Sequence, residues 1–271
     1  AHNDEFTTIG AEAFMNSSLR NVDLFDSVTT IGARAFAGCT QLEALTLPDS
    51  LTTIGEGALD GLTGLKKLVI QCDPAIIPAG VFANLPALSD VTVEFGEIPA
   101  HMFEGSGVTV LTLGAGVTEI GDSAFANTAL TSAEMQNVTA IGAGTFANTA
   151  LTSAEIQNVT AIGAGAFEGS ALERVQLNAA ASVGERAFAN TKLTKMVIPT
   201  AGSFPLSAVE GTSAELRLPA DATDEQLAAW NETLQRPWYD PMLREGEVSK
   251  FVKMPFEPTP AENFKFDPDT G

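Results

Sequence analysis

Residues 128–148 read TALTSAEMQNVTAIGAGTFAN, and residues 149–169 read TALTSAEIQNVTAIGAGAFEG. These adjacent stretches are identical at 17 of 21 positions, so the second is a copy of the first. Both contain a six-residue word of the form I-G-x-x-A-F, in which Thr145 replaces alanine in the first stretch. A direct repeat of roughly this length is typical of proteins built from stacked structural units.

The same word recurs along most of the chain at a step of 21 to 23 residues. Between the words lies a second pattern, L-x-x-L-x-L, of which Leu42, Leu45 and Leu47 are one example. The words begin at Ile9, Ile31, Ile54, Ile77, Ile98, Ile120, Ile141, Ile162 and Val183, with a degenerate tenth copy at Phe204. Copies at so constant a step predict a solenoid of about ten coils.

The two patterns predict the parts of one coil. The L-x-L portion alternates apolar and polar residues, as a strand with one buried face does. The spacing of Ile and Phe suits a short helical or 3-10 turn on the opposite side, and the glycine after Ile permits a tight backbone corner. Because one coil cannot bury its apolar edge alone, neighbouring coils must stack. A column of rings is therefore expected from Phe14, Phe36, Phe82, Phe103, Phe125, Phe146, Phe167 and Phe188.

These motifs carry a family resemblance. The stretches IGARAFAGCTQL (31–42), LEALTLPDSLTTIGEGAL (42–59) and VTEIGDSAF (117–125) resemble the BspA-like leucine-rich repeats of bacterial surface proteins. The resemblance covers roughly residues 5–219, although proline replaces the glycine of the word at Pro78 and Pro99. It implies an exported or surface-anchored protein with a role in adhesion or host interaction. The predicted fold is an α/β solenoid: a right-handed leucine-rich-repeat coil with about ten parallel strands on one face and short helical turns opposite.

Composition and charge narrow the functional classes. The chain has 14 Lys and Arg against 34 Asp and Glu, a formal net charge of −20 and a pI near 4.3. Nucleic acid and anionic membrane surfaces would be repelled, so neither is an expected partner. Two histidines and two cysteines provide little material for catalysis or for a zinc site. We therefore expect no enzyme, no cofactor and no metal, and we expect Cys39 and Cys72 to be free thiols.

The ends of the sequence bear on its location. Residues 1–20 lack a basic segment followed by an apolar one, so no signal peptide is expected within the chain. Met135 to Ala154 is a stretch of 20 residues without a charge, but its Gln, Asn, Thr and Ser residues argue against a membrane span. We expect the protein at the cell surface or secreted, with any signal or anchor outside this chain.

The repeat ends near residue 219, which predicts a solenoid over 1–219 and a separate C-terminal segment over 220–271. TDEQLAAWNETLQRP (223–237) is expected to be one helix, with Thr223 and Gln226 as a capping box. A solenoid needs its last coil covered, so this helix is predicted to be a cap. The aromatic residues assigned to the cap, or alternatively to a carbohydrate platform, are Trp230, Trp238 and Tyr239.

The last residues, 245–271, contain four phenylalanines that would be poorly placed in water. We expect this segment to be an extended arm along the solenoid rather than a free linker. The four residues that would anchor the arm are Phe251, Phe256, Phe264 and Phe266.

The open face of the predicted sheet is the candidate binding surface. Neighbouring strands lie about 4.8 Å apart, so Glu134 and Glu155 are expected side by side. Such a pair could hold a cation or shift one pKa, but a copied unit explains it equally. The side-chain amides of Gln136, Gln157 and Asn178 extend this surface and could form hydrogen bonds with sugar hydroxyls or a peptide backbone. The candidate ligand-binding residues are Ser132, Glu134, Gln136, Ser153, Glu155, Gln157, Arg174, Gln176 and Asn178.

Two functional hypotheses follow. The first is a non-enzymatic recognition or adhesion protein whose sheet face binds a host protein or a glycan outside the cell, as the family resemblance implies. The second is a structural spacer that presents another domain away from the cell surface. The near-identical stretches 128–148 and 149–169 favour the spacer, because a spacer needs length rather than a unique site.

Overall fold

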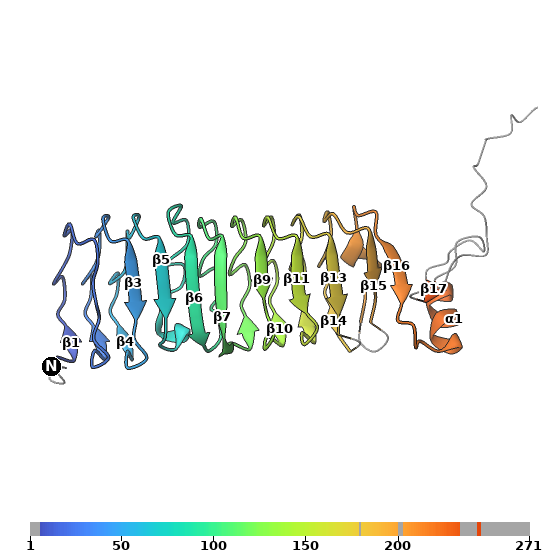
Figure 1. Cartoon of the computed structure of the whole chain (residues 1–271), viewed down its shortest axis with the longest axis horizontal. Helices are drawn as coiled ribbons and strands as arrows, with labels where there is room; N and C mark the ends of the chain where they lie inside the picture. Colours follow the sequence, from blue (N-terminus) through green and yellow to red (C-terminus); the bar gives the residue numbers. More distant parts are fainter. Residues whose placement is uncertain (1–5, 179, 200–202, 234–242, 245–271) are drawn as a thin grey trace, which may run out of the picture.

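A computed structural model describes residues 6–178, 180–199, 203–233 and 243–244. Over these residues the chain winds into an elongated solenoid of parallel strands, with the N-terminal coil at one end and the C-terminal helix at the other (Figure 1). The predicted parallel-strand solenoid of about ten coils is confirmed.

The L-x-L segments form the main row of strands, except for its last strand at residues 243–244, which lies beyond the repeat. The apolar residues of these segments point inward. The row is divided into two parallel sheets, one from β3 to β7 and one from β9 to β17. Its strands are β3 (Ala44–Leu47), β5 (Lys67–Ile70), β6 (Asp90–Phe95), β7 (Val110–Gly116), β9 (Ser132–Glu134), β11 (Ser153–Ile156), β13 (Arg174–Leu177), β15 (Lys195–Val197), β16 (Glu215–Leu218) and β17 (Leu243–Arg244).

A second row of two-residue strands runs along the edge where each coil leaves for the I-G-x-x-A-F turn. Each strand ends on the first residue of a word. These strands are β1 (Thr8–Ile9), β2 (Thr30–Ile31), β4 (Thr53–Ile54), β8 (Glu119–Ile120), β10 (Ala140–Ile141), β12 (Ala161–Ile162) and β14 (Ser182–Val183). The row is interrupted between β4 and β8, where the two words carry proline in place of glycine and the backbone N–H of that position is lost.

The side opposite the main row consists mostly of hydrogen-bonded turns. In the described part of the chain, regular helix is limited to the 3-10 helices η1 (Pro74–Ile76) and η2 (Leu206–Val209) and the α-helix α1 (Asp224–Thr233). Helical turns in every coil, and with them the α/β class, are therefore not confirmed. The physical reason is that the fourth residue of the first nine units and the eighth residue of all ten adopt positive φ, as at Arg34 and Gly38, which breaks a helix. The tenth unit, in which Ser207 at the fourth position lacks positive φ, forms η2.

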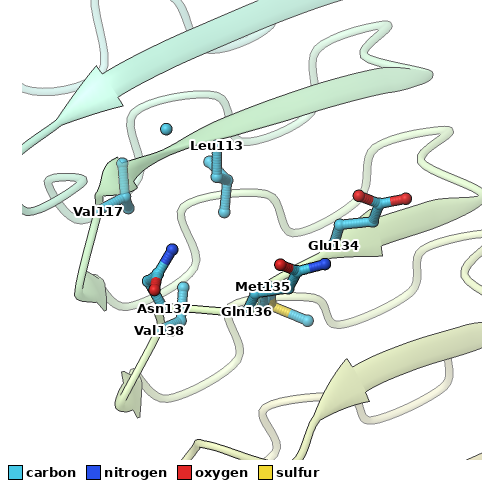
Figure 2. A pocket seen from close by; sticks show the side chains of 8 residues that line it. Leu113, Val117, Glu134, Met135, Gln136, Asn137 and Val138 are labelled. Carbon is cyan, nitrogen blue, oxygen red and sulfur yellow. The ribbon is translucent and has the colours of Figure 1, made fainter.

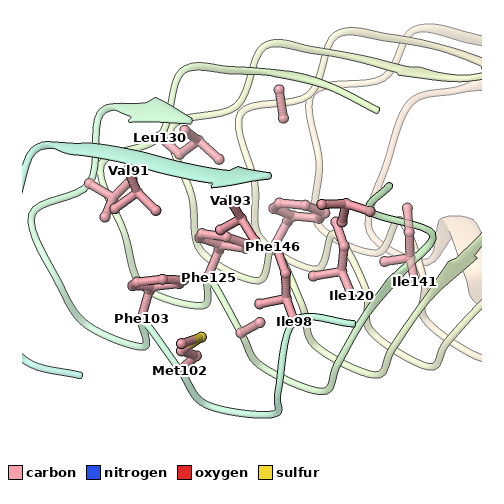
Figure 3. Packing of buried hydrophobic residues seen from close by; sticks show 14 of the residues in the cluster. Val91, Val93, Ile98, Met102, Phe103, Ile120, Phe125, Leu130, Ile141 and Phe146 are labelled. Atoms are coloured by element: carbon pink, nitrogen blue, oxygen red, sulfur yellow. The ribbon is translucent and has the colours of Figure 1, made fainter. Parts of the chain in front are cut away.

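The expected phenylalanine column is present in the core (Figure 3). Neighbouring rings are stacked with centroids 5.2 to 6.0 Å apart and interplanar angles of 5 to 18°. Six rings are continuous from Phe82 to Phe188, and Phe14 stacks on Phe36. Leu59 fills the equivalent buried position in the third coil, so an aliphatic side chain of sufficient size can take the place of a ring.

Truncation of one ring tests this column. Phe146 is fully buried between Phe125 and Phe167, so Phe146→Ala is expected to lose about 3–5 kcal/mol of unfolding free energy by opening a cavity. Phe146→Leu should lose clearly less, because Leu59 already occupies the same position of another coil. Urea unfolding of the two variants measures the difference. Equal losses would show that ring stacking itself, rather than filled volume, stabilises the column.

The glycine of the word has a different role from the one predicted. It does not adopt positive φ, so it is not needed for a strained corner. A Cβ there would instead lie 2.4 to 2.7 Å from a backbone nitrogen of the preceding coil, at Gly32, Gly55, Gly121, Gly142, Gly163 and Gly184. The glycine therefore permits close approach of two coils. Gly10 fits this explanation, because its coil has none described before it and a Cβ there meets nothing within 4 Å.

Alanine substitution separates the two roles. Gly163→Ala places a Cβ 2.5 Å from the backbone nitrogen of Ala143, and we expect it to cost about 1–3 kcal/mol through forced separation of two coils. Gly10→Ala is the matched control and should cost nothing, since the added methyl group meets open space. Denaturant midpoints of both variants test this. A similar loss at both positions would indicate that the glycine serves the local corner after all.

The eighth residue of each unit is Asn or Gly in all ten coils, and in each it has φ between 54 and 73°. Asn and Gly tolerate this left-handed conformation best. The next residue is often a buried hydroxyl that donates to the carbonyl of the phenylalanine three residues earlier, as Thr128 and Thr149 do at 2.8 and 2.9 Å. These two features fix the turn after the ring in one conformation along the solenoid.

At the C-terminal end, α1 begins at Asp224 and carries the predicted capping box. The Thr223 backbone N–H donates to Gln226 Oε1 at 2.8 Å, and the Gln226 backbone N–H donates to Thr223 Oγ1 at 3.2 Å. Leu227 is half-buried and packs against the core. The side chain of Trp230, residues Trp238 and Tyr239, and the whole arm 245–271 lie outside the described residues, so their predicted roles stay predictions.

Candidate ligand-binding face

The main row presents the candidate residues in straight lines across neighbouring strands. Parallel pairing places Ser132, Ser153 and Arg174 opposite one another, and it places Glu134, Glu155 and Gln176 in the next line. The residues between them, such as Ala133 and Ala154, are buried, so the candidate side chains face solvent. Each strand therefore adds one side chain to each line, and lines of this kind suit an extended ligand.

Glu134 and Glu155 lie side by side as expected, directly paired across β9 and β11. Both are exposed, and the next residue in the line after Glu155 is an amide, Gln176, rather than a further carboxylate. Among the residues that the structure describes, no group of three or more His, Cys, Asp or Glu side chains is placed to hold a metal ion. The pair is thus an exposed acidic patch that a cationic or hydroxyl-rich ligand could contact.

The amides that follow the strands are only partly available to a ligand. Asn158 Nδ2 donates to the carbonyl of Gln136 at 2.5 Å, and Asn178 Nδ2 donates to the carbonyl of Gln157 at 2.9 Å. Asn178 also accepts from the backbone N–H of Ala180 at 2.9 Å. Asn178 therefore clamps successive coils together, whereas Gln136 and Gln157 remain exposed on the face.

A first hollow lies where the two sheets of the main row meet, between β7 and β9 (Figure 2). No strand pairing joins β7 to β9, although residues 109–140 are all described. Leu113 and Val117 line one side of the hollow. Glu134, Gln136 and Asn137 line the other, so this small recess is mainly polar.

A second, larger hollow of about 650 Å³ lies on the face at β11, β13 and β15. It includes the predicted Ser153, Glu155, Gln157, Arg174 and Gln176. It also includes residues absent from the prediction: Glu173, Thr194, Lys195, Val197, Ile198, Pro199 and Pro219. The sequence gives little indication that these residues line a hollow. A hollow depends on how far two strands diverge, and a repeat pattern alone does not determine that distance.

The two cysteines lie in the core, away from this face. Both are buried free thiols, as expected. Cys39 Sγ donates to the carbonyl of Phe14 at 3.0 Å and lies 3.3 Å from Ser17 Oγ. Burial raises the pKa of the Cys72 thiol to about 11, so this group is a poor nucleophile near neutral pH.

Thiol labelling tests this placement. At pH 8 we expect neither Cys39 nor Cys72 to react with a charged disulfide reagent in the native chain, because both are buried. Labelling of the two thiols should become rapid in denaturant. For Cys72, native labelling by a small neutral reagent should rise with pH toward about 11, following its raised pKa. Fast labelling of the native chain at pH 8 would contradict the burial of these residues.

A cluster of charges on the turn side is structural. Arg186 Nη2 donates to Glu168 Oε1 at 2.6 Å, and Arg186 also pairs with Glu210. The hydrogen bond from Arg186 lowers the pKa of Glu168 below its usual range. The three residues belong to consecutive coils, so the cluster joins coils and does not form part of the binding face.

With the fold and the face described, comparison with known proteins gives the class. The chain matches the BspA type leucine rich repeat region, in six copies over residues 7–131 and 96–212. These matches span most of the chain, and the chain belongs to this family of bacterial-type leucine-rich repeats. Such repeats are in general a scaffold for interactions rather than for catalysis.

The fold is similar to three crystal structures. A leucine-rich repeat protein from Bacteroides ovatus ATCC 8483 is 18% identical, with 78% of each chain covered and a TM-score of 0.37. A leucine rich cell surface protein from Faecalibacterium prausnitzii A2-165 is 19% identical, with 83% of this chain and 85% of that chain covered and a TM-score of 0.30. A leucine-rich repeat protein from Eubacterium ventriosum ATCC 27560 is 19% identical, with 80% and 77% covered and a TM-score of 0.35.

No curated protein matches the sequence. In the part of the chain that the structure describes, no helix has the length and apolar character needed to cross a bilayer.

Proposed function

We propose that this chain is a non-enzymatic recognition protein that works at the cell surface or after secretion and binds a host protein or a glycan through its main sheet face. The supporting observation is the exposed, in-register rows that run across β9, β11 and β13. One side chain per strand at a constant spacing gives a long, regular contact surface. This face is extended and open. An active site usually needs a single deep recess that holds titratable groups with shifted pKa values.

The charge of the chain limits the kinds of partner that it can bind. The formal net charge of −20 and the exposed pair Glu134 and Glu155 favour a partner that is neutral or basic overall. Gln136 and Gln157 add exposed amides that can donate to and accept from sugar hydroxyls or a peptide backbone. An extracellular matrix protein or a neutral glycan meets these requirements.

The C-terminal helix belongs to this proposal as a cap. Leu227 packs against the core at the end of the solenoid, and the capping box fixes the start of α1. A covered end leaves the side face as the surface for partners.

A binding screen tests the proposal. The purified chain is screened against extracellular matrix proteins and a glycan array at physiological salt, and each saturable hit is measured again with Glu134→Lys/Glu155→Lys. We expect the affinity to fall by about tenfold or more, because the substitution reverses two adjacent charges in the face.

The matched control is Glu56→Lys/Glu185→Lys, which makes the same change of charge at exposed turn positions of two other coils. The control should retain its affinity. Hits that are weakened equally by both variants would reflect net charge alone and would contradict a binding face. Absence of any hit would favour the structural spacer, which the near-identical coils 128–148 and 149–169 support.

A further inference from the structure

The hollow at β13 and β15 holds two cationic side chains, Arg174 and Lys195, in a chain that is otherwise strongly acidic. Gln176 pairs with Val197 in parallel strands, and Arg174 and Lys195 each lie two residues earlier in these strands. The two cationic side chains therefore start from equivalent positions of neighbouring strands. Both line the hollow.

Arg174 differs from most basic residues of the described chain in its pairing. Arg34, Lys66, Lys67 and Arg186 each lie within 4 Å of a carboxylate. Arg174 is exposed and forms no such ion pair with any described residue. Its guanidinium group, with five N–H donors in a planar fork, is therefore available to an external carboxylate.

The floor of the same hollow is aliphatic. Val197 is half-buried, Pro199 is buried, and Pro219 closes the hollow from the end of β16. These groups offer no hydrogen-bond donor, and they favour an apolar side chain packed beside the cations.

The hollow exists because β13 and β15 diverge. β13 pairs with β11 at four positions but with β15 at one, Gln176 with Val197. β15 then pairs with β16 at three positions. Pairing is lost at the starts of β13 and β15, where Arg174 and Lys195 lie. The two cations are therefore located where the strands separate.

We propose that this hollow binds a protein segment that presents one carboxylate next to an aliphatic side chain. The carboxylate would pair with Arg174, close to Lys195, and the aliphatic group would pack on Val197, Pro199 and Pro219. This inference rests on the proposed function, since it specifies what the face recognises. The partner would still be neutral or basic overall, but the segment that enters the hollow would carry a single acidic group.

The rim of the hollow limits how acidic the ligand can be. Glu155 and Glu173 also line it, and a second or third carboxylate of the ligand would meet them at close range. Juxtaposed like charges oppose binding, so polyanionic segments are rejected. Gln157 and Gln176 lie beside the cations and can bond the backbone of an extended segment.

The experiment uses a phage-displayed library of random peptides, panned on the immobilised full chain at physiological salt. Enriched peptides are synthesised and their affinities measured with the wild-type chain, with Arg174→Glu/Lys195→Glu, and with Arg20→Glu/Lys192→Glu. The last variant makes the same change of charge at exposed positions outside the hollow. Circular dichroism and thermal melts of each variant establish that it is folded.

We expect enriched peptides to share one Asp or Glu beside an aliphatic residue. Their affinity should fall by about tenfold or more in Arg174→Glu/Lys195→Glu and stay within about twofold in the control. Replacing the acidic residue of the peptide by its amide should cause the same loss in the wild-type chain and little further loss in the hollow variant.

Each of the following results would overturn the inference. Enriched peptides without an acidic residue, or binding retained in the hollow variant, would exclude the role of the two cations. Peptide binding lost in Glu134→Lys/Glu155→Lys but not in the hollow variant would leave the proposed function in place and move the site toward β9. No enriched peptide, with a glycan bound to the face, would also leave recognition in place but exclude a peptide ligand.

Discussion

The structure depends on the stacking of one coil directly on the next at the spacing of a parallel sheet. On the turn side, the backbone N–H of most ring residues donates to a carbonyl of the following coil, as from Phe146 to Ala166 and from Phe167 to Ala187, both at 2.7 Å. This register explains the glycine of most words, since Gly142 and Gly163 leave no room for a Cβ against the preceding coil. It also brings the rings into one column, because equivalent residues of neighbouring coils must lie above one another.

The same register produces the candidate face. Once coils stack, the outward residues of β9, β11 and β13 form lines whether or not a ligand selects them, so alignment alone does not identify a site. What distinguishes one part of the face is where stacking loosens. Pairing is absent between β7 and β9 and is reduced to one position between β13 and β15, and a hollow lies at each place. The second hollow also holds Arg174 and Lys195, and this combination is the basis of the proposal that the face has a specific partner.

Much of this architecture could be predicted from the repeat. The steps between words gave the coils, the alternation of Leu45 and Leu47 with polar neighbours gave the inward face, and the spacing of the phenylalanines gave the ring column. Two predictions were not confirmed, each for a local reason. The turns were expected to be helical, but residues such as Arg34 with positive φ interrupt them, and the glycine was assigned to a corner when contact between coils requires it. The Asn or Gly at the eighth position was visible in every copy and could have revealed the left-handed turn. The hollow at β13 could not be predicted, because it reflects the divergence of two strands whose sequences both satisfy the repeat.

Deletion of one complete coil tests the central claim that the stacked coil is the unit of this structure. Removing residues 149–169 joins Asn148 to Ser170, which keeps the repeat in register and leaves β13 to pair with β9. We expect the shortened chain to fold, to retain the far-ultraviolet spectrum of the solenoid and to unfold cooperatively at a slightly lower denaturant concentration, because only one coil and one interface are lost. A molten or aggregated product from this in-register deletion, with a folded control in which the full chain is treated identically, would contradict the account.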